Sequence, residues 1–179
     1  LSRGLIRQAV QQGGLEAVAN LRRGHASRGP WASRCRGLGG HFVQHELVHD
    51  GRRFRYAVFV PAAAQPRPLP VVLFLHGSGE RGSDGQAQTT AGLGNWLRAN
   101  ADRFPALVVF PQAPDDEEWM GDNARMALAT LDAASAEFGG DPARTYATGM
   151  SMGGYGTWEV ALAAPDRFAA LVPVCGGVR

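Results

Sequence analysis

A continuous apolar run, Val-Val-Leu-Phe-Leu at residues 71–75, lies between Pro70 and the pair His76-Gly77. A strand with apolar residues on both faces is typical of a parallel sheet that helices cover on both sides. A second run of this kind, Ala-Leu-Val-Val-Phe, occupies residues 106–110. The two runs therefore favour an α/β fold with a buried, mostly parallel sheet.

The segments around these runs alternate between strand and helix patterns. Residues 41–49 and 53–60 alternate in polarity around Asp50-Gly51, which predicts an N-terminal antiparallel hairpin. An apolar stripe predicts a helix over residues 124–138, with Asp122 or Asn123 as its N-cap and a turn at Asp141-Pro142 after it. Further patterns predict helices at 95–104 and 152–164, and strands at 145–149 and 169–174.

The first 40 residues differ in charge from the rest of the 179-residue chain. They carry a net charge of +6, from seven Arg and one Glu, whereas the other 139 residues carry −4, from 11 Arg and 15 acids. A targeting segment, a nucleic-acid-binding arm and a poorly ordered leader or linker all fit this pattern. We favour the leader, because terminal segments without a core usually fray. Residues 41–179 then form the N-terminal part of one α/β domain.

Composition argues against several classes of protein. No apolar run approaches the about 20 residues of a membrane-spanning helix, and no apolar centre of a secretory signal follows the basic residues. The net charge of +2 is too small to indicate a polyanionic partner for the whole chain. Cys35 and Cys175 form no disulfide framework. We expect no membrane or nucleic-acid partner, and the sequence does not indicate a compartment.

The pentapeptide Gly149-Met150-Ser151-Met152-Gly153 is a G-x-S-x-G motif. It follows an expected strand and opens an expected helix, which is the setting of a nucleophile elbow. Gly149 and Gly153 lack Cβ atoms, so the strand and the helix can approach closely. The helix N-terminus also favours negative charge near Ser151. The motif predicts Ser151 as a catalytic nucleophile. The alternative is an ordinary strand–turn–helix connection that contains a serine.

The sequence His-Gly-Ser-Gly-Glu-Arg-Gly at residues 76–82 follows the first apolar run. Acyl transfer needs backbone donors where the oxyanion develops. We expect these donors to be the N–H groups of Ser78 and Met152, and we expect Gly77 to let the backbone come close to the substrate. The absence of a following Gly-Lys-Ser/Thr argues against a phosphate-binding loop.

Three segments resemble a known family: LFLHGSGERGSDG at 73–85, VVFPQAP with EEW at 108–119, and DPARTYATGMSMGGYGTWEVALAAPDRFAALVPVCGG at 141–177. They look like α/β-hydrolases of the esterase and predicted-peptidase kind, relatives of polyhydroxybutyrate depolymerases, feruloyl esterases and dienelactone hydrolases. The resemblance covers about residues 50–177. It implies an α/β-hydrolase fold and a Ser-His-Asp triad without a cofactor. Ser151 matches the nucleophile, and Ser78 and Met152 match the oxyanion positions.

The triad is incomplete in this sequence. The family order is Ser, acid, His, yet all five histidines precede Ser151. Of the acids after Ser151, Glu159 lies in the expected helix, and Asp166 lies in a Pro-Asp-Arg-Phe stretch that is structural in the family. We therefore expect the triad acid and histidine beyond residue 179, and weak or no triad catalysis by the chain itself. His76, which in the family orders the oxyanion loop, is a less favoured candidate base.

Trp119 lies in a loop that the resemblance places near the nucleophile. It is a candidate for packing against substrate; the alternative is that it anchors the loop as its one large apolar residue. The acids of the same loop do not have EF-hand spacing, so we expect solvated side chains and no metal site. These acids are Asp115, Asp116, Glu117, Glu118 and Asp122.

The favoured function is hydrolysis of a small-molecule carboxylic ester. A serine peptidase similar to prolyl oligopeptidase is the alternative within enzymes, and a non-catalytic, incomplete hydrolase chain is the alternative outside them. Absent C-terminal strands leave an apolar sheet edge at residues 169–174, which we expect to be prone to pairing with another chain. The oligomeric state is not indicated.

Overall fold

The computed structural model describes residues 39–62 and 65–178. The leader expected over residues 1–40 lies outside this range, apart from Gly39 and Gly40. Within the described residues, no helix is long and apolar enough to cross a membrane.

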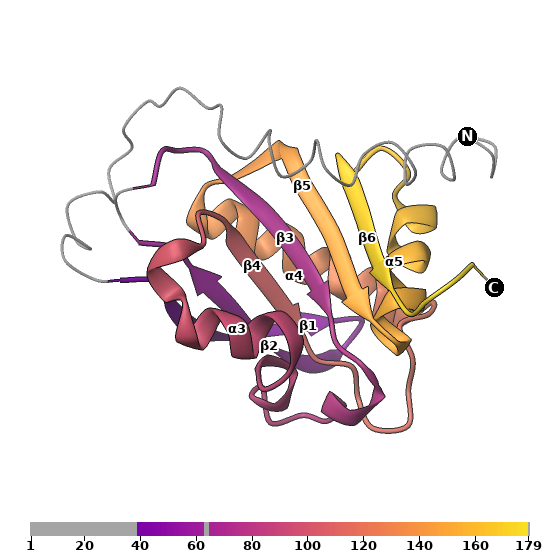
Figure 1. The fold of residues 1–179 in the computed structure, drawn as a ribbon. Coiled ribbons are helices and arrows are strands. Elements are labelled where there is room, and N and C mark those ends of the chain that lie inside the picture. Colours follow the sequence, from indigo (N-terminus) through magenta and orange to yellow (C-terminus); the bar gives the residue numbers. More distant parts are fainter. Residues whose placement is uncertain (1–38, 63–64, 179) are drawn as a thin grey trace.

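Six strands form one mixed sheet in the order β1-β2-β4-β3-β5-β6 (Figure 1). β1 pairs with β2, and β2 with β4, in antiparallel fashion; β4, β3, β5 and β6 are mutually parallel. This arrangement confirms the predicted α/β class with an N-terminal antiparallel hairpin. The strands are β1 (His41–His49), β2 (Arg52–Val60), β3 (Leu69–Leu75), β4 (Leu107–Pro111), β5 (Gly140–Met150) and β6 (Ala170–Val174).

The turn between β1 and β2 consists of Asp50 and Gly51. Both residues have positive φ, 48° and 75°. A two-residue turn with positive φ at both positions matches the right-handed twist of a hairpin, and Asp-Gly is one of the pairs that adopt it most readily. The predicted hairpin is confirmed, with His49 opposite Arg52.

Helices cover both faces of the sheet. α4 (Asp122–Phe138) and α5 (Met152–Ala163) lie on one face, and α3 (Gly92–Ala99) lies on the other (Figure 1). Leu73, Met126 and Val160 belong to one buried cluster, whereas Phe74, Leu97 and Phe110 belong to the second. Because successive strand residues point to opposite faces, the apolar run of β3 supplies both clusters. The described residues also form three short 3₁₀ helices: η2 (Ser78–Glu80), η3 (Ala87–Thr89) and η4 (Ala101–Arg103).

The start of α4 differs from the prediction. The N-cap is Gly121, with φ 50° and ψ −116°, and no side chain caps the helix. Asp122 and Asn123 are already helical. The Asn123 amide instead donates hydrogen bonds to Glu117 Oε2 at 2.8 Å and to the Glu118 carbonyl at 2.9 Å. The expected cap is therefore wrong, because Asn123 is committed to the preceding loop.

β5 begins earlier than the expected strand at 145–149. Its pairing with β3 shifts between Leu69 and Val71, and the turn predicted at Asp141-Pro142 lies within this irregularity. There the Asp141 carboxylate accepts a hydrogen bond from the Ala143 N–H at 2.9 Å. The hydrogen bond of a turn is thus present at Asp141, but the residues on both sides of the turn, Gly140 and Thr145, pair with β3.

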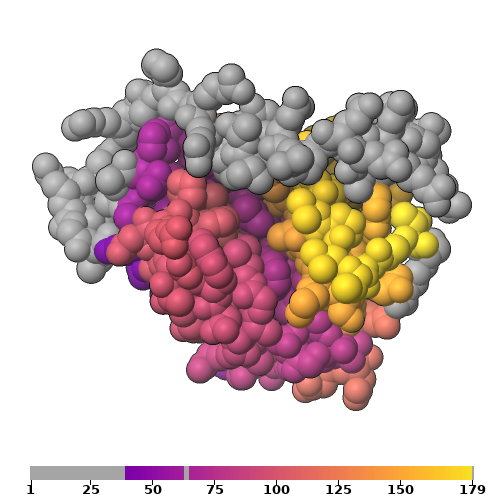
Figure 2. Space-filling view, in the orientation of Figure 1, coloured from indigo at the N-terminus to yellow at the C-terminus, as the bar shows by residue number. Residues whose placement is uncertain are grey.

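β6 lies at one edge of the sheet in the described part of the chain, and β1 lies at the other. Val172 and Val174 of β6 are 51% and 44% exposed. Figure 2 shows β6 and the residues after it, in yellow, on the molecular surface.

Candidate active site

Ser151 lies in the sharp connection between β5 and α5. Its backbone adopts φ 54° and ψ −115°, and its side chain is exposed. An L-residue rarely adopts this conformation, so neighbouring contacts have to hold it. The Ser151 N–H donates to the Val174 carbonyl at 2.9 Å, and the Ser151 carbonyl accepts from the Gly154 N–H at 2.8 Å. The end of β6 and the first turn of α5 thus fix the serine from both sides.

Two glycines make this turn possible. A Cβ on Gly149 would lie 2.2 Å from the Gly153 carbonyl oxygen, and a Cβ on Gly153 would lie 1.9 Å from the Leu75 carbonyl oxygen. Both distances are far below van der Waals contact. The close approach of β5, α5 and β3 therefore requires glycine at both positions, as the sequence motif predicts.

The loop after β3 lies directly beside Ser151. A Cβ on Gly77 would be 3.9 Å from the Ser151 Cβ and 3.5 Å from the Met150 carbonyl oxygen. η2 begins at Ser78, and α5 begins at Met152. The first N–H groups of a helix have no partner within that helix. The chain therefore brings two helix beginnings to the neighbourhood of one exposed hydroxyl.

His76 supports this loop from beneath and is 1% exposed. The Ala113 N–H donates to its Nε2 at 3.0 Å, so the ring proton is on Nδ1, which donates to the Gly77 carbonyl at 2.6 Å. Burial lowers the pKa of His76 to about 4, against the opposing effect of the Gly77 hydrogen bond. Both ring nitrogens are occupied and the ring is neutral. This arrangement argues against His76 as a catalytic base and assigns it to positioning of the loop.

Trp119 is 1% exposed and forms part of the same support. Its Nε1 donates to the His76 carbonyl at 3.0 Å, and its Cβ would lie 2.4 Å from a Cβ on Gly156 of α5. This enclosure favours the alternative, an anchor of the loop, and the substrate-binding role expected for Trp119 stays a prediction.

The acidic loop contains no metal-binding arrangement among the residues that the structure describes. Glu117 instead pairs with Arg52 at 2.8 Å, and hydrogen bonds from Arg52 and then Asn123 lower the pKa of its carboxyl. Asp122 pairs with Arg125 on the surface of α4. Glu117 and Asp122 thus both have structural partners.

Gln112 is a support residue that our sequence analysis missed. It follows β4, is 2% exposed, and accepts a hydrogen bond from the Gly85 N–H at 2.7 Å. Its Nε2 donates to the Glu80 carbonyl at 3.2 Å and to Asp84 Oδ1 at 2.9 Å. The available signal was a polar residue directly after a buried strand, where its side chain reaches the loops at the carboxyl edge of the sheet.

Comparison with known proteins agrees with this geometry. No family model matches the chain. It is 31% identical over 129 residues to a poly(3-hydroxyalkanoate) depolymerase C from Paucimonas lemoignei, over 64% of this chain and 30% of the relative. A solved thermostable esterase is 30% identical over 77% of this chain and 42% of its own, with a TM-score of 0.65. The chain therefore has the α/β-hydrolase fold and is similar to esterases with that fold.

The fold of this α/β-hydrolase chain is also found in a more distant structure. The feruloyl esterase module of Clostridium thermocellum is 16% identical, with a TM-score of 0.60 over 83% of this chain and 58% of the module. At this identity the likeness concerns the fold. The α/β-hydrolase chain spans 30% of the depolymerase and 42% of the thermostable esterase.

Proposed function

We propose that the chain supplies the nucleophile and the oxyanion hole of a serine hydrolase that acts on small carboxylic esters. The observation that carries the proposal is the backbone of Ser151, held at φ 54° and ψ −115° with its side chain exposed beside Gly77. Strain of this kind is retained where function requires it. The similarity to a thermostable esterase and to a polyester depolymerase supports an ester as the substrate class.

In the proposed reaction, Ser151 Oγ attacks the ester carbonyl carbon while a base takes its proton. The carbonyl oxygen becomes negatively charged, and the N–H groups of Ser78 and Met152 stabilise it. The tetrahedral intermediate collapses to an acyl-serine and releases the alcohol, which receives the proton. Water then attacks the acyl-serine and regenerates Ser151.

The base and the acid of this mechanism are proposed to come from polypeptide beyond Arg179. His76 is occupied on both ring nitrogens. The other described histidines, His41, His45 and His49, lie on β1, an edge strand that three other strands separate from β5 in the sheet. Glu159 lies within α5, and Asp166 follows that helix.

Fluorophosphonate labelling with peptide mapping tests the nucleophile. We expect modification of Ser151 ahead of the other serines of the chain, because the elbow and the backbone donors are in place. The label should be lost in Ser151→Ala and retained in the matched control Ser135→Ala, since Ser135 bonds within α4. Modification of other serines to the same extent as Ser151, or ahead of it, would contradict the proposal.

Hydrolysis of p-nitrophenyl esters tests whether the chain itself contains a catalytic base. We expect turnover far below that of serine hydrolases, because a free serine hydroxyl is barely ionised at neutral pH. Enzyme-like turnover that Ser151→Ala abolishes would show that the chain already contains its base. Matched ester and amide substrates separate an esterase from a peptidase similar to prolyl oligopeptidase.

A further inference from the structure

Three arginines line a pocket that the proposed reaction does not use. The pocket has a volume of about 360 Å³; Arg52, Arg53 and Arg55 of β2 line it together with Gly82, Ser83 and Gln112. We call it the arginine pocket. Gly82 and Ser83 follow β3 and Gln112 follows β4, so the pocket opens at the carboxyl edge of the parallel strands. Ser151 lies at the same edge, at the end of β5.

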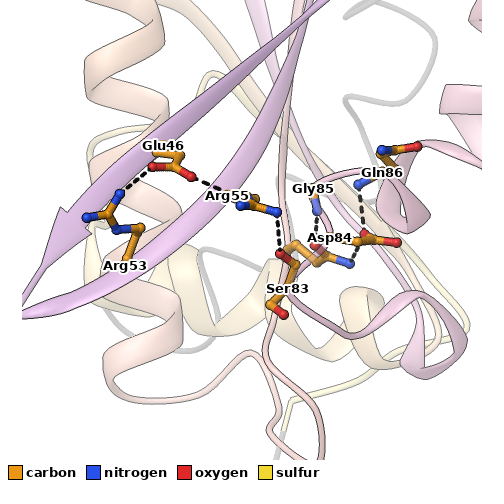
Figure 3. Close-up of polar contacts among 8 residues, drawn as sticks. Glu46, Arg53, Arg55, Ser83, Asp84, Gly85 and Gln86 are labelled. Carbon is orange, nitrogen blue, oxygen red and sulfur yellow. Dashed lines mark hydrogen bonds and ion pairs between the residues drawn. The ribbon is translucent and has the colours of Figure 1, made fainter.

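The acids that neutralise these arginines do not line the pocket. Arg53 and Arg55 both donate to Glu46 of β1, at 2.9 and 3.1 Å, and Arg52 pairs with Glu117 at 2.8 Å (Figure 3 shows the Glu46 pairs). The charged groups of the lining itself are guanidinium groups alone. The pocket therefore presents guanidinium N–H groups, while the carboxylates that pair with them lie outside its lining.

The guanidinium groups retain donors for a ligand. Each arginine has five N–H donors in a fixed planar fork. Within the described part of the chain, hydrogen bonds to Glu117, Glu46 and Ser83 use one N–H of Arg53 and two each of Arg52 and Arg55. A planar fork pairs best with the two oxygens of a carboxylate or phosphate group.

The pocket is also held in shape before any ligand binds. Arg55 lies between Glu46 and the Ser83 carbonyl, to which it donates at 3.3 Å (Figure 3). On the other side of the loop, Gln112 forms hydrogen bonds with Asp84 and Gly85. Fixing the loop in advance reduces the ordering that binding would otherwise require.

We propose that the arginine pocket binds the carboxylate or phosphate group of a small anion. Two sources share this chemistry: a free anion, or the acidic end of an ester whose carbonyl reaches Ser151. Binding of a free anion does not depend on the proposed function, whereas binding of an acidic ester as a substrate rests on it. The exposed acids Asp115 and Asp116 lie on the loop after Pro114, and solvent screens their charge.

Titrations followed by ¹H–¹⁵N NMR test the proposal on the whole chain in buffer of low ionic strength. The probes are inorganic phosphate, succinate and monoethyl succinate, which carries both a carboxylate and an ester. We expect saturable shifts of the Arg53 and Arg55 Nε–H signals with all three. Additional shifts of the Ser78 and Met152 amides with monoethyl succinate identify the substrate as the source; shifts confined to the arginines identify a free anion.

Two variants locate the binding. Replacing both Arg53→Gln and Arg55→Gln should weaken the affinity at least tenfold. Ser83→Glu keeps every arginine but adds a carboxylate to the lining, and it should weaken the affinity to a similar extent. Arg125→Gln, on the surface of α4, is the matched control and should bind as the wild type does. The absence of saturable arginine shifts, or unchanged affinity in both pocket variants, would overturn the proposal. Fluorophosphonate labelling of Ser151 tests the proposed function independently of anion binding.

Discussion

The indole Nε1 of Trp119 donates a hydrogen bond to the backbone carbonyl of His76 at 3.0 Å, and the two rings meet edge to face with centroids 4.9 Å apart. This contact joins the loop before α4 to the residue that precedes the proposed oxyanion loop. Both side chains are 1% exposed. The backbone beside Ser151 is therefore supported by two buried rings.

Trp119→Phe should destabilise the chain by about 1–3 kcal/mol, because it leaves the buried His76 carbonyl without its donor. Urea unfolding measures the change. The control is Trp96→Phe, since Trp96 is 44% exposed and a surface change alters stability by at most about 0.5 kcal/mol. Equal effects of the two substitutions would show that the hydrogen bond to His76 is unimportant.

Ser78→Pro should lower the rate of fluorophosphonate labelling at Ser151 by about 10²–10³-fold, since it removes one proposed oxyanion donor. Gly77 has φ −78° and ψ −178°, an extended backbone that tolerates a following proline. Proline is also accepted at the first position of a helix. Ser78→Ala keeps the N–H and is the matched control. If both variants label at the same rate, the Ser78 N–H is not an oxyanion donor.

His76 should make folding less favourable at acidic pH. Its pKa is about 4 when folded and near 6.5 when unfolded, so between these values the unfolded chain binds a proton that the folded chain excludes. The free energy of unfolding should therefore fall by about 3 kcal/mol as the pH decreases from 6.5 to 4, and this contribution should be constant below pH 4. Urea unfolding of wild type and His76→Gln across this range measures it. An identical pH dependence in the two proteins would contradict the assignment.

Ser151→Gly should stabilise the chain by about 1 kcal/mol, because glycine adopts positive φ without the strain of an L side chain. Ser151→Ala also removes the hydroxyl but keeps the Cβ, so it should not gain this stability. Thermal unfolding of the two variants separates the effect of strain from that of the hydroxyl. A Gly variant no more stable than the Ala variant would mean that the elbow stores no strain.

Association through β6 stays a prediction. Lysine on an edge strand discourages pairing between chains, so Val172→Lys should lower any concentration-dependent rise in molar mass. Light scattering across a range of protein concentrations measures this. Val48→Lys on β1, at the opposite edge, is the matched control. A greater effect of Val48→Lys would place the contact at the other edge.

The strands and the elbow were predictable because their signals are local. Apolar runs at 71–75 and 106–110 become β3 and β4, and Gly149 and Gly153 remove the Cβ atoms that the elbow excludes. The resemblance to esterases rests on these same segments. The constraint on Gly149 acts within five residues, because a Cβ there would meet Gly153, whereas the constraint on Gly153 comes from Leu75 of β3. The motif makes both glycines visible in the sequence.

The partners of the supporting residues were not predictable, because most of them are distant in the chain. Trp119 bonds to His76 across 43 residues, and Gln112 bonds to Glu80 across 32. Asn123 differs, because its partners Glu117 and Glu118 are close in the chain; it resembles a helix cap until its bonds to the preceding loop are known. Propensity describes what a residue can do locally, and tertiary contacts select among those options.

Gly121 and Ser151 begin the two long helices on one face of the sheet from the same backbone conformation, φ 50° and ψ −116° against φ 54° and ψ −115°. At Gly121 nothing lies within 4 Å of the position a Cβ would occupy, so the open site differs from the elbow mainly in its surroundings. Gly121 therefore allows a comparison, within one protein, with the backbone conformation of Ser151. Placing serine at position 121 and glycine at position 151 separates two contributions to the free energy of unfolding. One is the intrinsic cost of this backbone conformation for a serine, and the other is the stabilisation of the conformation by the residues around Ser151.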